Sequence, residues 1–414
     1  MAEYNFLELA KNAKIASKKL ATISTEIKNK ALLAIAEALE ANRNRIFEAN
    51  RQDLELAKGN ISQAVFNRLK LDDNKMRDMI QGVVDVYELE DPIGKILLQR
   101  TLDTGLILTK KSCPIGVLGI IFEARPDVIS QISALAIKSS NAVILKGGKE
   151  STNTNKIIME VIQEALGKVK EFPQHVLTQV FSRDDVKEML AQDKYIDLII
   201  PRGGNSLVQF VKENTKIPVL GHADGICHIF VDESADIEKA KRIIIDAKTQ
   251  YPSACNAVET LLIHKDYPAQ DELTQALKDA GIELVLTPDS WHKEYSDKTL
   301  SIKTVRSFEE AIEHINEFSS GHTEAIITED RENAQIFLSA IDSAGVYHNV
   351  STRFADGFRY GFGAEVGIST NKTHARGPVG LEGLTIYKYT IQGNGDIVAD
   401  YVEGKKKFNH KDLV

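Results

Sequence analysis

The sequence contains few cysteines, and those few are far apart. Only Cys113, Cys227 and Cys255 occur among the 414 residues. An odd number of cysteines without a CxxC pair argues against a disulfide framework and a structural zinc site, and it fits a reducing compartment. His222 and His228 flank Cys227, but their spacing matches no structural zinc pattern. The sequence therefore predicts no metal site.

Long apolar runs and an excess of positive charge are also missing. The longest uncharged apolar run lies around Ile115–Phe122, far short of the ~20 residues that a membrane span needs. The N-terminal residues show no secretory signal pattern, so we expect a cytoplasmic protein. The net charge is -8 and the 51 basic residues are dispersed, which leaves no basic stripe for a phosphate backbone. We therefore expect neither a membrane nor a nucleic acid as partner.

The periodicity of the apolar residues predicts an α/β protein. Helical spacing over about residues 5–90 predicts a helical opening section, and short β-rich runs over 95–122 predict a hairpin. Strands and helices then alternate to about residue 212, and a second such series follows a charged helix. Alternation with continuous apolar strands is typical of doubly wound parallel sheets. We expect two α/β domains that meet near residue 245.

The stretch over residues 351–384 is rich in glycine and poor in periodicity. Its Gly361–Gly367 run looks superficially like a dinucleotide fingerprint, but the spacing is wrong and no βαβ unit follows. Long irregular segments in compact domains are often functional. We therefore expect this stretch to contribute to a site, and a last strand over 385–391 to follow it.

Cys255 is the best candidate for a nucleophile. It lies in the run Tyr251-Pro-Ser-Ala-Cys-Asn256, between a predicted helix and a predicted strand, where small and polar residues predict an exposed turn. Backbone N–H groups at such a turn stabilise a thiolate, which is the reactive form of the side chain. Cys113 and Cys227 lie inside strand-like apolar runs, so for them we favour a buried, inert thiol.

Two strand ends have the character of anion-binding loops. After the strand over 197–200 comes the run Pro201-Arg-Gly-Gly-Asn-Ser206 and then a helix, whose free N–H groups and dipole favour an anion. The run Lys146-Gly-Gly-Lys149 follows another strand but lacks the spacing of a Walker A loop. The sequence therefore predicts a nucleotide at the carboxyl ends of the strands, without nucleotide hydrolysis.

Seven motifs, taken in order, resemble those of the gamma-glutamyl phosphate reductases, a family of the aldehyde dehydrogenase superfamily. The resemblance spans nearly the whole chain. The motifs are Phe122-Glu-Ala-Arg-Pro-Asp-Val128, Leu145-Lys-Gly-Gly-Lys-Glu150, Ile200-Pro-Arg-Gly-Gly-Asn205, His222-Ala-Asp-Gly225, Tyr251-Pro-Ser-Ala-Cys-Asn256, Asn349-Val-Ser-Thr-Arg-Phe-Ala-Asp-Gly357 and His374-Ala-Arg-Gly-Pro-Val-Gly-Leu-Glu-Gly383. Together they are far more specific than any one of them alone.

The resemblance implies a fold and a reaction. The expected fold is aldehyde dehydrogenase-like, with two doubly wound parallel-sheet domains and a β-flap for oligomerisation. The expected domains are an NADPH-binding domain over 1–98 and 114–245, a catalytic domain over 246–384, and a flap with a tail over 99–113 and 385–414. The implied reaction is the NADPH-dependent reduction of L-glutamate 5-phosphate to L-glutamate 5-semialdehyde and phosphate, the second step of proline biosynthesis. A thiolate at Cys255 can displace phosphate from an acyl phosphate, so one nucleophile suffices.

The expected site residues fall into three groups. The catalytic group is Cys255, with its backbone N–H, and Asn256 or the 122–128 loop as oxyanion donors. The cofactor-binding group is Lys146, Lys149, Arg202, Gly203, Gly204, Asn205, Ser206 and Glu365. The substrate-binding group is Arg125, Arg353, Asp356, His374 and Arg376, because arginine forks match carboxylate and phosphate oxygens.

Three departures from the wider superfamily are informative. Hydrolytic aldehyde dehydrogenases carry a water-activating Glu where this chain has His222-Ala-Asp-Gly225, so the thioester is left for phosphate rather than water. They carry a Trp-Asn pair where this chain has Glu123-Ala-Arg-Pro126, which leaves the second oxyanion donor open. NAD-dependent members have a Glu three residues after the strand lysine, whereas this chain has Lys149, whose charge favours the 2′-phosphate of NADPH.

Two other classes of function fit parts of the sequence. One is a hydrolytic NAD(P)-dependent dehydrogenase of a small aldehyde, which the missing Glu disfavours. The other is a two-lobed binding protein, which the position of Cys255 disfavours. The resemblance implies a homo-oligomer, and the sequence leaves open whether it contains two or four copies. It does not tell whether a glutamate 5-kinase passes the labile acyl phosphate on directly.

Overall fold

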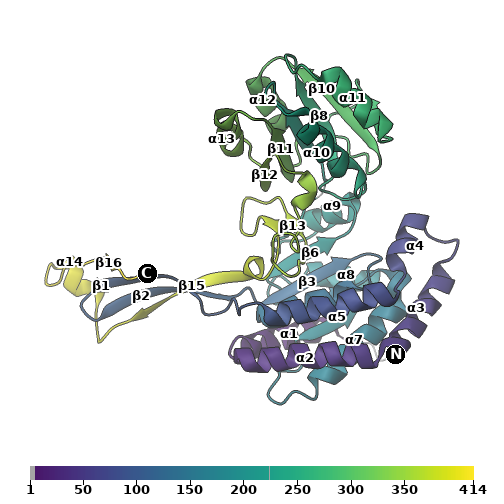
Figure 1. Ribbon diagram of the computed structural model, residues 1–414. Helices are drawn as coiled ribbons and strands as arrows, with labels where there is room; N and C mark the ends of the chain where they lie inside the picture. Colours follow the sequence, from purple (N-terminus) through teal and green to yellow (C-terminus); the bar gives the residue numbers. More distant parts are fainter. Residues whose placement is uncertain (1–4, 223) are drawn as a thin grey trace.

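The computed structural model describes residues 5–222 and 224–414, apart from the side chain of Ala64. It contains two parallel sheets, each with its own helices, and an antiparallel sheet that extends away from both (Figure 1). The expected α/β fold with two parallel-sheet units and a flap is confirmed. Within the described residues, no helix combines the length and the apolar character needed to cross a membrane.

The opening section is helical, as the periodicity predicts. Its helices are α1 (Phe6–Leu20), α2 (Thr25–Ala41), α3 (Arg43–Ala57), α4 (Gln63–Leu69) and α5 (Asp73–Glu88). Asn5, Ser24, Ser62 and Asp72 each precede a helix, and each side chain accepts a hydrogen bond from a backbone N–H of its first turn. Such caps satisfy N–H groups that lack partners within the helix, which explains where these helices begin.

The first parallel sheet has the strand order β5-β4-β3-β6. Its strands are β3 (Val117–Phe122), β4 (Ala142–Lys146), β5 (Leu177–Val180) and β6 (Leu198–Arg202), and its helices are α6 (Val128–Lys138), α7 (Thr152–Leu166), α8 (Arg183–Leu190) and α9 (Asn205–Glu213). Leu118 and Ile120 belong to the core formed with α2, α5, α6 and α7, whereas Val117 and Ile121 belong to the core formed with α1 and α8. Alternate strand residues therefore face opposite helical layers, and the sheet is buried on both faces.

The second parallel sheet has the order β12-β11-β7-β8-β10-β9. Its strands are β7 (Cys227–Val231), β8 (Val258–His264), β9 (Glu283–Val285), β10 (Thr299–Val305), β11 (Thr323–Ile327) and β12 (Gly345–His348), and its helices are α10 (Ile237–Thr249), α11 (Gln270–Asp279), α12 (Phe308–Phe318) and α13 (Arg331–Ala340). Because β7 pairs with β8 and β11 near the centre of this sheet, the boundary expected near residue 245 is wrong. By sheet membership the second unit begins at about residue 226.

The glycine-rich segment after β12 returns to the first unit. It contains the short strands β13 (Ile368–Ser369) and β14 (Gly377–Pro378). Ala364, Val366 and Leu381 are buried in the same core as Leu118 of the first sheet. About the last twenty residues of the expected catalytic domain over 246–384 therefore pack on the first unit and not on the second.

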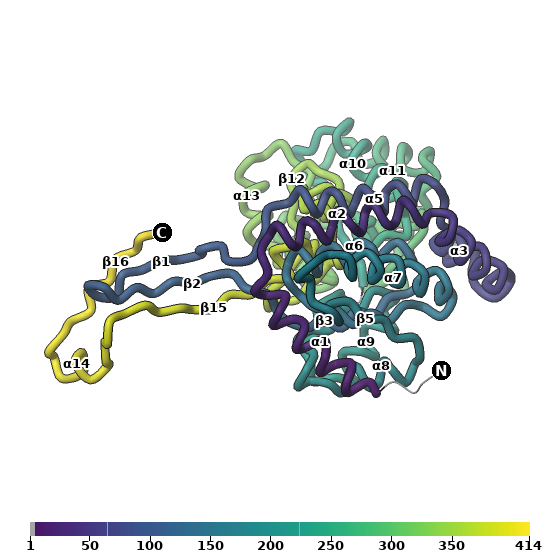
Figure 2. Tube along the Cα trace, turned by 90° about the horizontal axis from the view of Figure 1, so that it is seen from below, coloured from purple at the N-terminus to yellow at the C-terminus, as the bar shows by residue number. Residues whose placement is uncertain are grey.

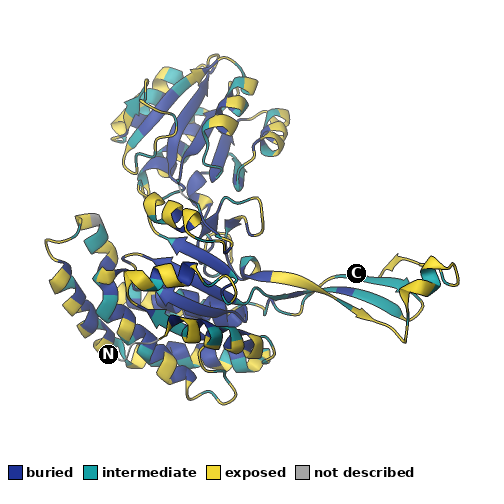
Figure 3. Cartoon of the chain, turned by 180° about the vertical axis from the view of Figure 1, so that it is seen from behind, coloured by how far each residue is buried: buried dark blue, intermediate teal, exposed yellow. Residues whose placement is uncertain are grey.

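The projecting sheet is built from two distant parts of the chain. It has the order β15-β2-β1-β16, from β1 (Ile96–Asp103), β2 (Leu106–Pro114), β15 (Thr385–Gln392) and β16 (Lys411–Asp412), with the short helix α14 (Val398–Val402) at its end. Figure 2 shows this sheet extending from the body of the molecule, and Figure 3 shows how much of it is exposed. The hairpin expected over 95–122 is thus the β1–β2 pair.

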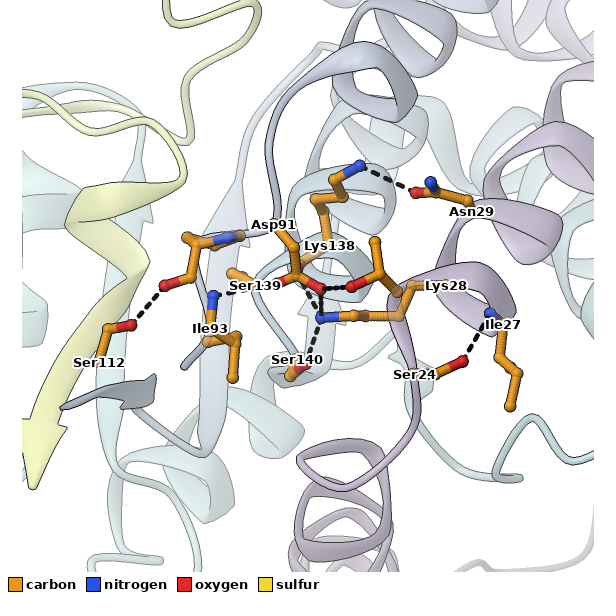
Figure 4. Close-up of polar contacts among 12 residues, drawn as sticks. Ser24, Ile27, Lys28, Asn29, Asp91, Ile93, Ser112, Lys138, Ser139 and Ser140 are labelled. Carbon is orange, nitrogen blue, oxygen red and sulfur yellow. Dashed lines mark hydrogen bonds and ion pairs between the residues drawn. The ribbon is translucent and has the colours of Figure 1, made fainter. Parts of the chain in front are cut away.

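A buried polar cluster ties the root of the projecting sheet to the first unit (Figure 4). The Lys28 ammonium is 1% exposed; it pairs with the Asp91 carboxylate and donates to the carbonyl oxygen of Lys138 at 3.3 Å. Burial lowers the pKa of Lys28, and the Asp91 carboxylate opposes that shift. The Ser112 hydroxyl of β2 donates to the carbonyl oxygen of Pro92 at 2.6 Å. Because a buried charge is tolerated only when paired and hydrogen-bonded, these contacts hold the segment that leads into β1.

Candidate active site

A cleft of about 2330 Å³ lies between the two parallel-sheet units. It is lined by the carboxyl ends of β3, β4 and β6, the turn before β8 and the irregular segment after β12. Most of the residues predicted for the site line it: Cys255, Asn256, Lys146, Lys149, Arg202, Gly203, Gly204, Asn205, Ser206, Glu365, Arg125, Arg353 and Asp356. Side chains from five separate motifs are therefore brought to one place.

His374 and Arg376 are not among the residues that line this cleft, so their substrate-binding role stays a prediction. The His374 Nε2 lies 3.0 Å from the carbonyl oxygen of Thr385, at the start of β15. The Arg376 guanidinium donates to the backbone and the carboxylate of Asp342, each at 3.0 Å. Both side chains are used to hold the irregular segment in place, so their polar groups are already satisfied by the protein.

Cys255 lies in the turn between α10 and β8, half-exposed to the cleft. The turn is closed by the Ala254 N–H, which donates to Tyr251, and by the Ala257 N–H, which donates to Ala254. The Cys255 carbonyl oxygen accepts a hydrogen bond from the buried Cys227 thiol at 3.4 Å. Burial strongly raises the pKa of the Cys227 thiol, which agrees with the expectation of an inert thiol there.

Gly225 passes directly against the backbone of Cys255. A β-carbon at this position would lie 2.2 Å from the Cys255 carbonyl oxygen and 2.4 Å from its Cα. The Gly225 N–H donates to the Glu294 carboxylate at 3.0 Å. A glycine is therefore required at this position by close approach of two backbones, and the loop before β7 supports the turn that carries the cysteine.

The Asn256 side chain is 3% exposed and is held by the protein. Its amide nitrogen donates to the carbonyl oxygen of Ala355 at 2.8 Å. This bond joins the cysteine turn to the segment after β12. The side chain therefore has a positioning role, and the backbone N–H groups of the turn are the better candidates for oxyanion donors.

Two histidines lie beside Cys255; His222 belongs to a sequence motif, whereas no sequence pattern indicated His322. The Cys255 Sγ, one ring nitrogen of His222 and one ring nitrogen of His322 lie within 4.8 Å of one another. The two imidazole rings meet edge to face, with centroids 4.9 Å apart. Burial lowers the pKa of His222, so this ring is neutral at neutral pH. The position of His222 beside Cys255 fits the superfamily comparison, in which the His222-Ala-Asp-Gly225 motif stands where hydrolytic relatives carry their water-activating Glu.

Arg202 and Glu365 meet at the floor of the cleft. Their charged groups are 4.0 Å apart, and the Glu365 carboxylate also accepts from the Gly357 N–H at 2.8 Å. Burial lowers the pKa of Arg202, and the charges of Glu365 and Cys255 oppose that shift. Arg202 thus places a positive charge in the cleft that Cys255 lines, where it favours an anionic substrate.

Further cationic side chains reach the cleft from α4 and α5, where no motif pointed to them. Arg68 and Lys75 line the cleft together with Arg125 and Arg353. The Arg353 guanidinium lies over the ring of Tyr251, 5.8 Å from its centroid. Burial raises the pKa of Tyr251, but a Ser253 hydrogen bond and the Arg68 and Arg125 charges outweigh it, so the pKa is lowered overall. The cysteine therefore faces several positive charges.

The lysine loop after β4 forms another part of the cleft. Burial lowers the pKa of Lys146, and the neighbouring Glu150 carboxylate opposes this shift. Lys149 is exposed, and its ammonium makes no hydrogen bond or ion pair with any residue that the structure describes. A β-carbon at Gly147 would lie 2.2 Å from the Asn155 amide and 3.1 Å from the Phe122 ring. The glycine at position 147 therefore lets the loop pack closely against α7 and β3. The Lys149 ammonium is available to a ligand.

The loop after β6 runs into α9. The Gly204 N–H, at the start of this helix, donates to the Glu123 carboxylate at 3.2 Å. The Asn205 amide donates to the Asp224 carboxylate. The Glu123 and Asp224 carboxylates therefore already accept hydrogen bonds from the first residue of α9 and from the loop before it.

Comparison with known proteins agrees with this geometry. The model of the aldehyde dehydrogenase family matches residues 3–290 and 289–367. Gamma-glutamyl phosphate reductase from Brachyspira hyodysenteriae is 58% identical over 98% of this chain and 99% of its own length, and the same enzyme from Trichodesmium erythraeum is 52% identical over 100% of both. The chain belongs to the gamma-glutamyl phosphate reductases of the aldehyde dehydrogenase family. It is thus an oxidoreductase by family, as the motifs predicted.

Solved structures extend the likeness to three dimensions. Gamma-glutamyl phosphate reductase from Thermotoga maritima superposes with a TM-score of 0.92 at 42% identity, over 95% of this chain and 100% of that one. An acetylating aldehyde dehydrogenase from Geobacillus thermoglucosidasius superposes with a TM-score of 0.67 at 18% identity, over 95% of this chain and 97% of the other. The second likeness is one of fold alone. The aldehyde dehydrogenase fold is therefore shared well beyond the relatives with similar sequences.

Proposed function

We propose that this chain reduces L-glutamate 5-phosphate to L-glutamate 5-semialdehyde and phosphate with NADPH, through a thioester at Cys255, as the second step of proline biosynthesis. The observation that carries the proposal is the position of Cys255, in a cleft lined by Arg68, Lys75, Arg125, Arg202 and Arg353. An acyl phosphate that also bears a carboxylate needs both a nucleophile and several cationic partners.

The chemistry at Cys255 follows from its surroundings. The thiolate attacks the acyl carbon, the bond from that carbon to the phosphate oxygen breaks, and phosphate leaves with the electron pair. The positive charge of Arg202, which lines the same cleft, stabilises the departing anion. We assign the developing oxyanion to backbone N–H groups of the Cys255 turn, since the Asn256 amide donates to Ala355.

The residues of the cleft fit a phosphorylated dinucleotide. When bound, NADPH supplies a hydride to the thioester carbon. Lys146, Lys149 and the loop Arg202–Ser206 would hold it, because they line the cleft at the carboxyl ends of β4 and β6. The free ammonium of Lys149 supports a charge partner for the 2′-phosphate. Glu365, which is paired with Arg202, remains a proposed cofactor contact.

The proposed substrate contacts are Arg125, Arg353 and Asp356 of the sequence motifs, joined by Arg68. The Lys75 ammonium lines the cleft but donates to the carbonyl oxygens of Asn67, Arg68 and Lys70. The arginines are candidates for the two anionic groups of the substrate, because guanidinium forks match carboxylate and phosphate oxygens. Asp356 is the candidate for the ammonium group. Its carboxylate lies 3.5 Å from the Arg359 guanidinium, so the substrate ammonium and Arg359 would both contact this carboxylate.

Lys149→Glu should shift the cofactor preference from NADPH toward NADH. The carboxylate repels a 2′-phosphate but accepts a hydrogen bond from a 2′-hydroxyl, and a charge-assisted contact is worth about 1.5–3 kcal/mol, or roughly ten- to a hundredfold in affinity. Steady-state kcat/KM with each cofactor measures the shift. Lys156→Glu, on the exposed face of α7, is the control for a change in net charge alone. Unchanged selectivity in Lys149→Glu would place this lysine away from the ribose.

The reverse reaction should depend on inorganic phosphate or arsenate. With semialdehyde and NADP but neither anion, we expect at most one NADPH per active site, since the thioester persists without a base to direct water at it. If a base is present after all, it is Asp224, which accepts from Asn205, or Glu365, which is held by Gly357 and Arg202. Installing a carboxylate by His222→Glu should add a slow phosphate-independent turnover.

Absorbance of NADPH in a rapid-mixing experiment measures both the burst and the steady rate. Sustained phosphate-free oxidation by the unmodified chain would contradict the proposal. It would favour instead the hydrolytic dehydrogenase of a small aldehyde, with one of the side chains beside Cys255 as base.

We also propose that the projecting sheet binds a second copy of this chain. β15 is an edge strand, and Ile386, Tyr387, Tyr389 and Ile391 are exposed on it. A long exposed apolar edge strand is a template for pairing with another chain. Ile386→Asp with Ile391→Asp should therefore lower the mass measured by sedimentation equilibrium, whereas Leu56→Asp, an exposed leucine of α3, should not. An unchanged mass in the double variant would place the contact elsewhere.

A further inference from the structure

The geometry points to a binding site for Zn²⁺ or a similar soft divalent cation, formed by the Cys255 thiolate and the imidazoles of His222 and His322. Their donor atoms lie within 4.8 Å of one another. One thiolate and two imidazoles are ligands that zinc prefers, and three protein ligands with one open position are typical of accessible zinc sites. A cation bound at this site would block the Cys255 sulfur, which the proposed reaction uses as its nucleophile.

The two rings are oriented in the way that metal-binding histidines are. The His222 Nδ1 lies 2.9 Å from the carbonyl oxygen of Ile368, so this nitrogen carries the proton and Nε2 keeps its lone pair. The His322 Nδ1 lies 2.8 Å from the Thr323 hydroxyl. A hydrogen bond from the second ring nitrogen to a carbonyl or hydroxyl fixes the ring and raises its basicity as a ligand. In His222, Nε2 is therefore the nitrogen left for a cation, and in His322 it is left when Nδ1 donates to the Thr323 hydroxyl.

The His322 ring carries a second, independent indication of a ligand. It is 1% exposed, and among the residues that the structure describes its buried Nε2 has no hydrogen-bond partner. Leaving a buried polar atom unpaired costs about 1–3 kcal/mol. A cation bound between His322 and Cys255 would remove that penalty, and no rearrangement of the Nδ1 contacts would be needed.

Charged groups of both signs act on the site. Arg202 acts on His222 with a positive charge, whereas Glu294 and Glu365 act on it with negative charges. Arg353 acts on Cys255 with a further positive charge. Cys255 and His222 line the cleft, so a hydrated cation reaches them from solvent, and binding displaces the thiol proton to water while the S–metal bond forms.

Cobalt titration tests the site directly, with no substrate present. Full-length protein stripped with a chelator is titrated with Co²⁺, and the thiolate-to-metal charge-transfer band and the d–d bands of a tetrahedral site are recorded. We expect one equivalent of Co²⁺ to produce these bands and Zn²⁺ to displace it. Cys255→Ser should abolish the charge-transfer band, and His222→Gln and His322→Asn should each weaken binding by at least about tenfold.

Two control variants separate this site from other thiols and metal-binding groups. Cys113→Ser removes a thiol on β2. His264→Asn removes the buried histidine of a second group, in which the exposed Glu233 and Asp266 carboxylates also lie within 4.8 Å of it. Both controls should bind Co²⁺ like the unmodified chain. A spectrum without the thiolate band, or equal affinity in His222→Gln, His322→Asn and the unmodified chain, would overturn the proposal.

Inhibition connects the site to activity, and this part rests on the proposed function. Zn²⁺ should inhibit the NADPH-linked reaction at the free concentrations that fill the site, as calculated from the Zn²⁺ Kd that the competition with Co²⁺ gives, and a chelator should restore the rate. If Co²⁺ binds through the thiolate but no glutamate 5-phosphate is reduced by the metal-free protein, the metal site stands and the proposed function fails. If the metal-free protein turns over and Zn²⁺ has no effect at concentrations that fill the site, the inhibitory role fails.

Discussion

Cys255→Ser should lower the rate of L-glutamate 5-phosphate reduction by at least about a thousandfold and leave NADPH binding unchanged. Serine has a far higher pKa than cysteine, so at neutral pH it offers no anion to attack the acyl carbon. The cofactor contacts proposed on β4 and β6 do not involve the sulfur. The rate is measured by NADPH absorbance and the binding by fluorescence titration.

Cys113→Ser is the matched control for that experiment, because Cys113 lies on β2 of the projecting sheet, outside the cleft. It should keep nearly full activity. Cys227→Ser should keep most of it, although the Cys227 thiol donates to the Cys255 carbonyl oxygen. Substantial activity in Cys255→Ser would rule out the covalent mechanism.

Gly225→Ala should reduce turnover by about a hundredfold, although it adds a single methyl group. That group would lie 2.2 Å from the Cys255 carbonyl oxygen, so either the cysteine turn or the loop before β7 must shift. A displacement of about 1 Å at a reacting group costs about a hundredfold in rate, and overpacking costs about 1–3 kcal/mol of stability. Steady-state kinetics and thermal unfolding measure the two effects.

Gly221→Ala provides the comparison within the same loop. A β-carbon there would be 3.6 Å from the Pro201 side chain, which is an ordinary contact. We expect little change in either measurement. If Gly225→Ala were as active and as stable as Gly221→Ala, the loop would not support the cysteine turn.

Local patterns were enough to predict the elements and the main site motifs. The apolar period of the first ninety residues predicted helices, and continuous apolar strands predicted parallel sheets, because both patterns reflect which residues face a core. The turn that carries Cys255, the lysine loop after β4 and the glycines after β6 were recognised because each motif is contiguous. Carboxyl ends of parallel strands lie at one edge of a sheet, so these loops were expected to face one cleft.

Placement across the boundary between the two units was not predictable in this way. The boundary predicted near residue 245 puts the residues of β7 in the first unit, yet β7 pairs with β8 and β11 of the second sheet. His374 and Arg376 belong to a family motif, but they satisfy Thr385 and Asp342 instead of facing the cleft. A motif specifies residue types, whereas the direction of each side chain depends on the packing around it.

The sequence by itself determined the family and the fold class and singled out Cys255 as the proposed nucleophile, because these depend on short contiguous patterns and on the apolar period. Only the tertiary structure shows which distant residues surround Cys255. Gly225, His222 and His322 reach it from β-strand ends and loops between 30 and 67 residues away in the chain. Arg68 and Lys75 reach the cleft from the opening helices. Such contacts arise when two sheets and a returning segment pack together, and no local pattern encodes which distant residues then share one cavity.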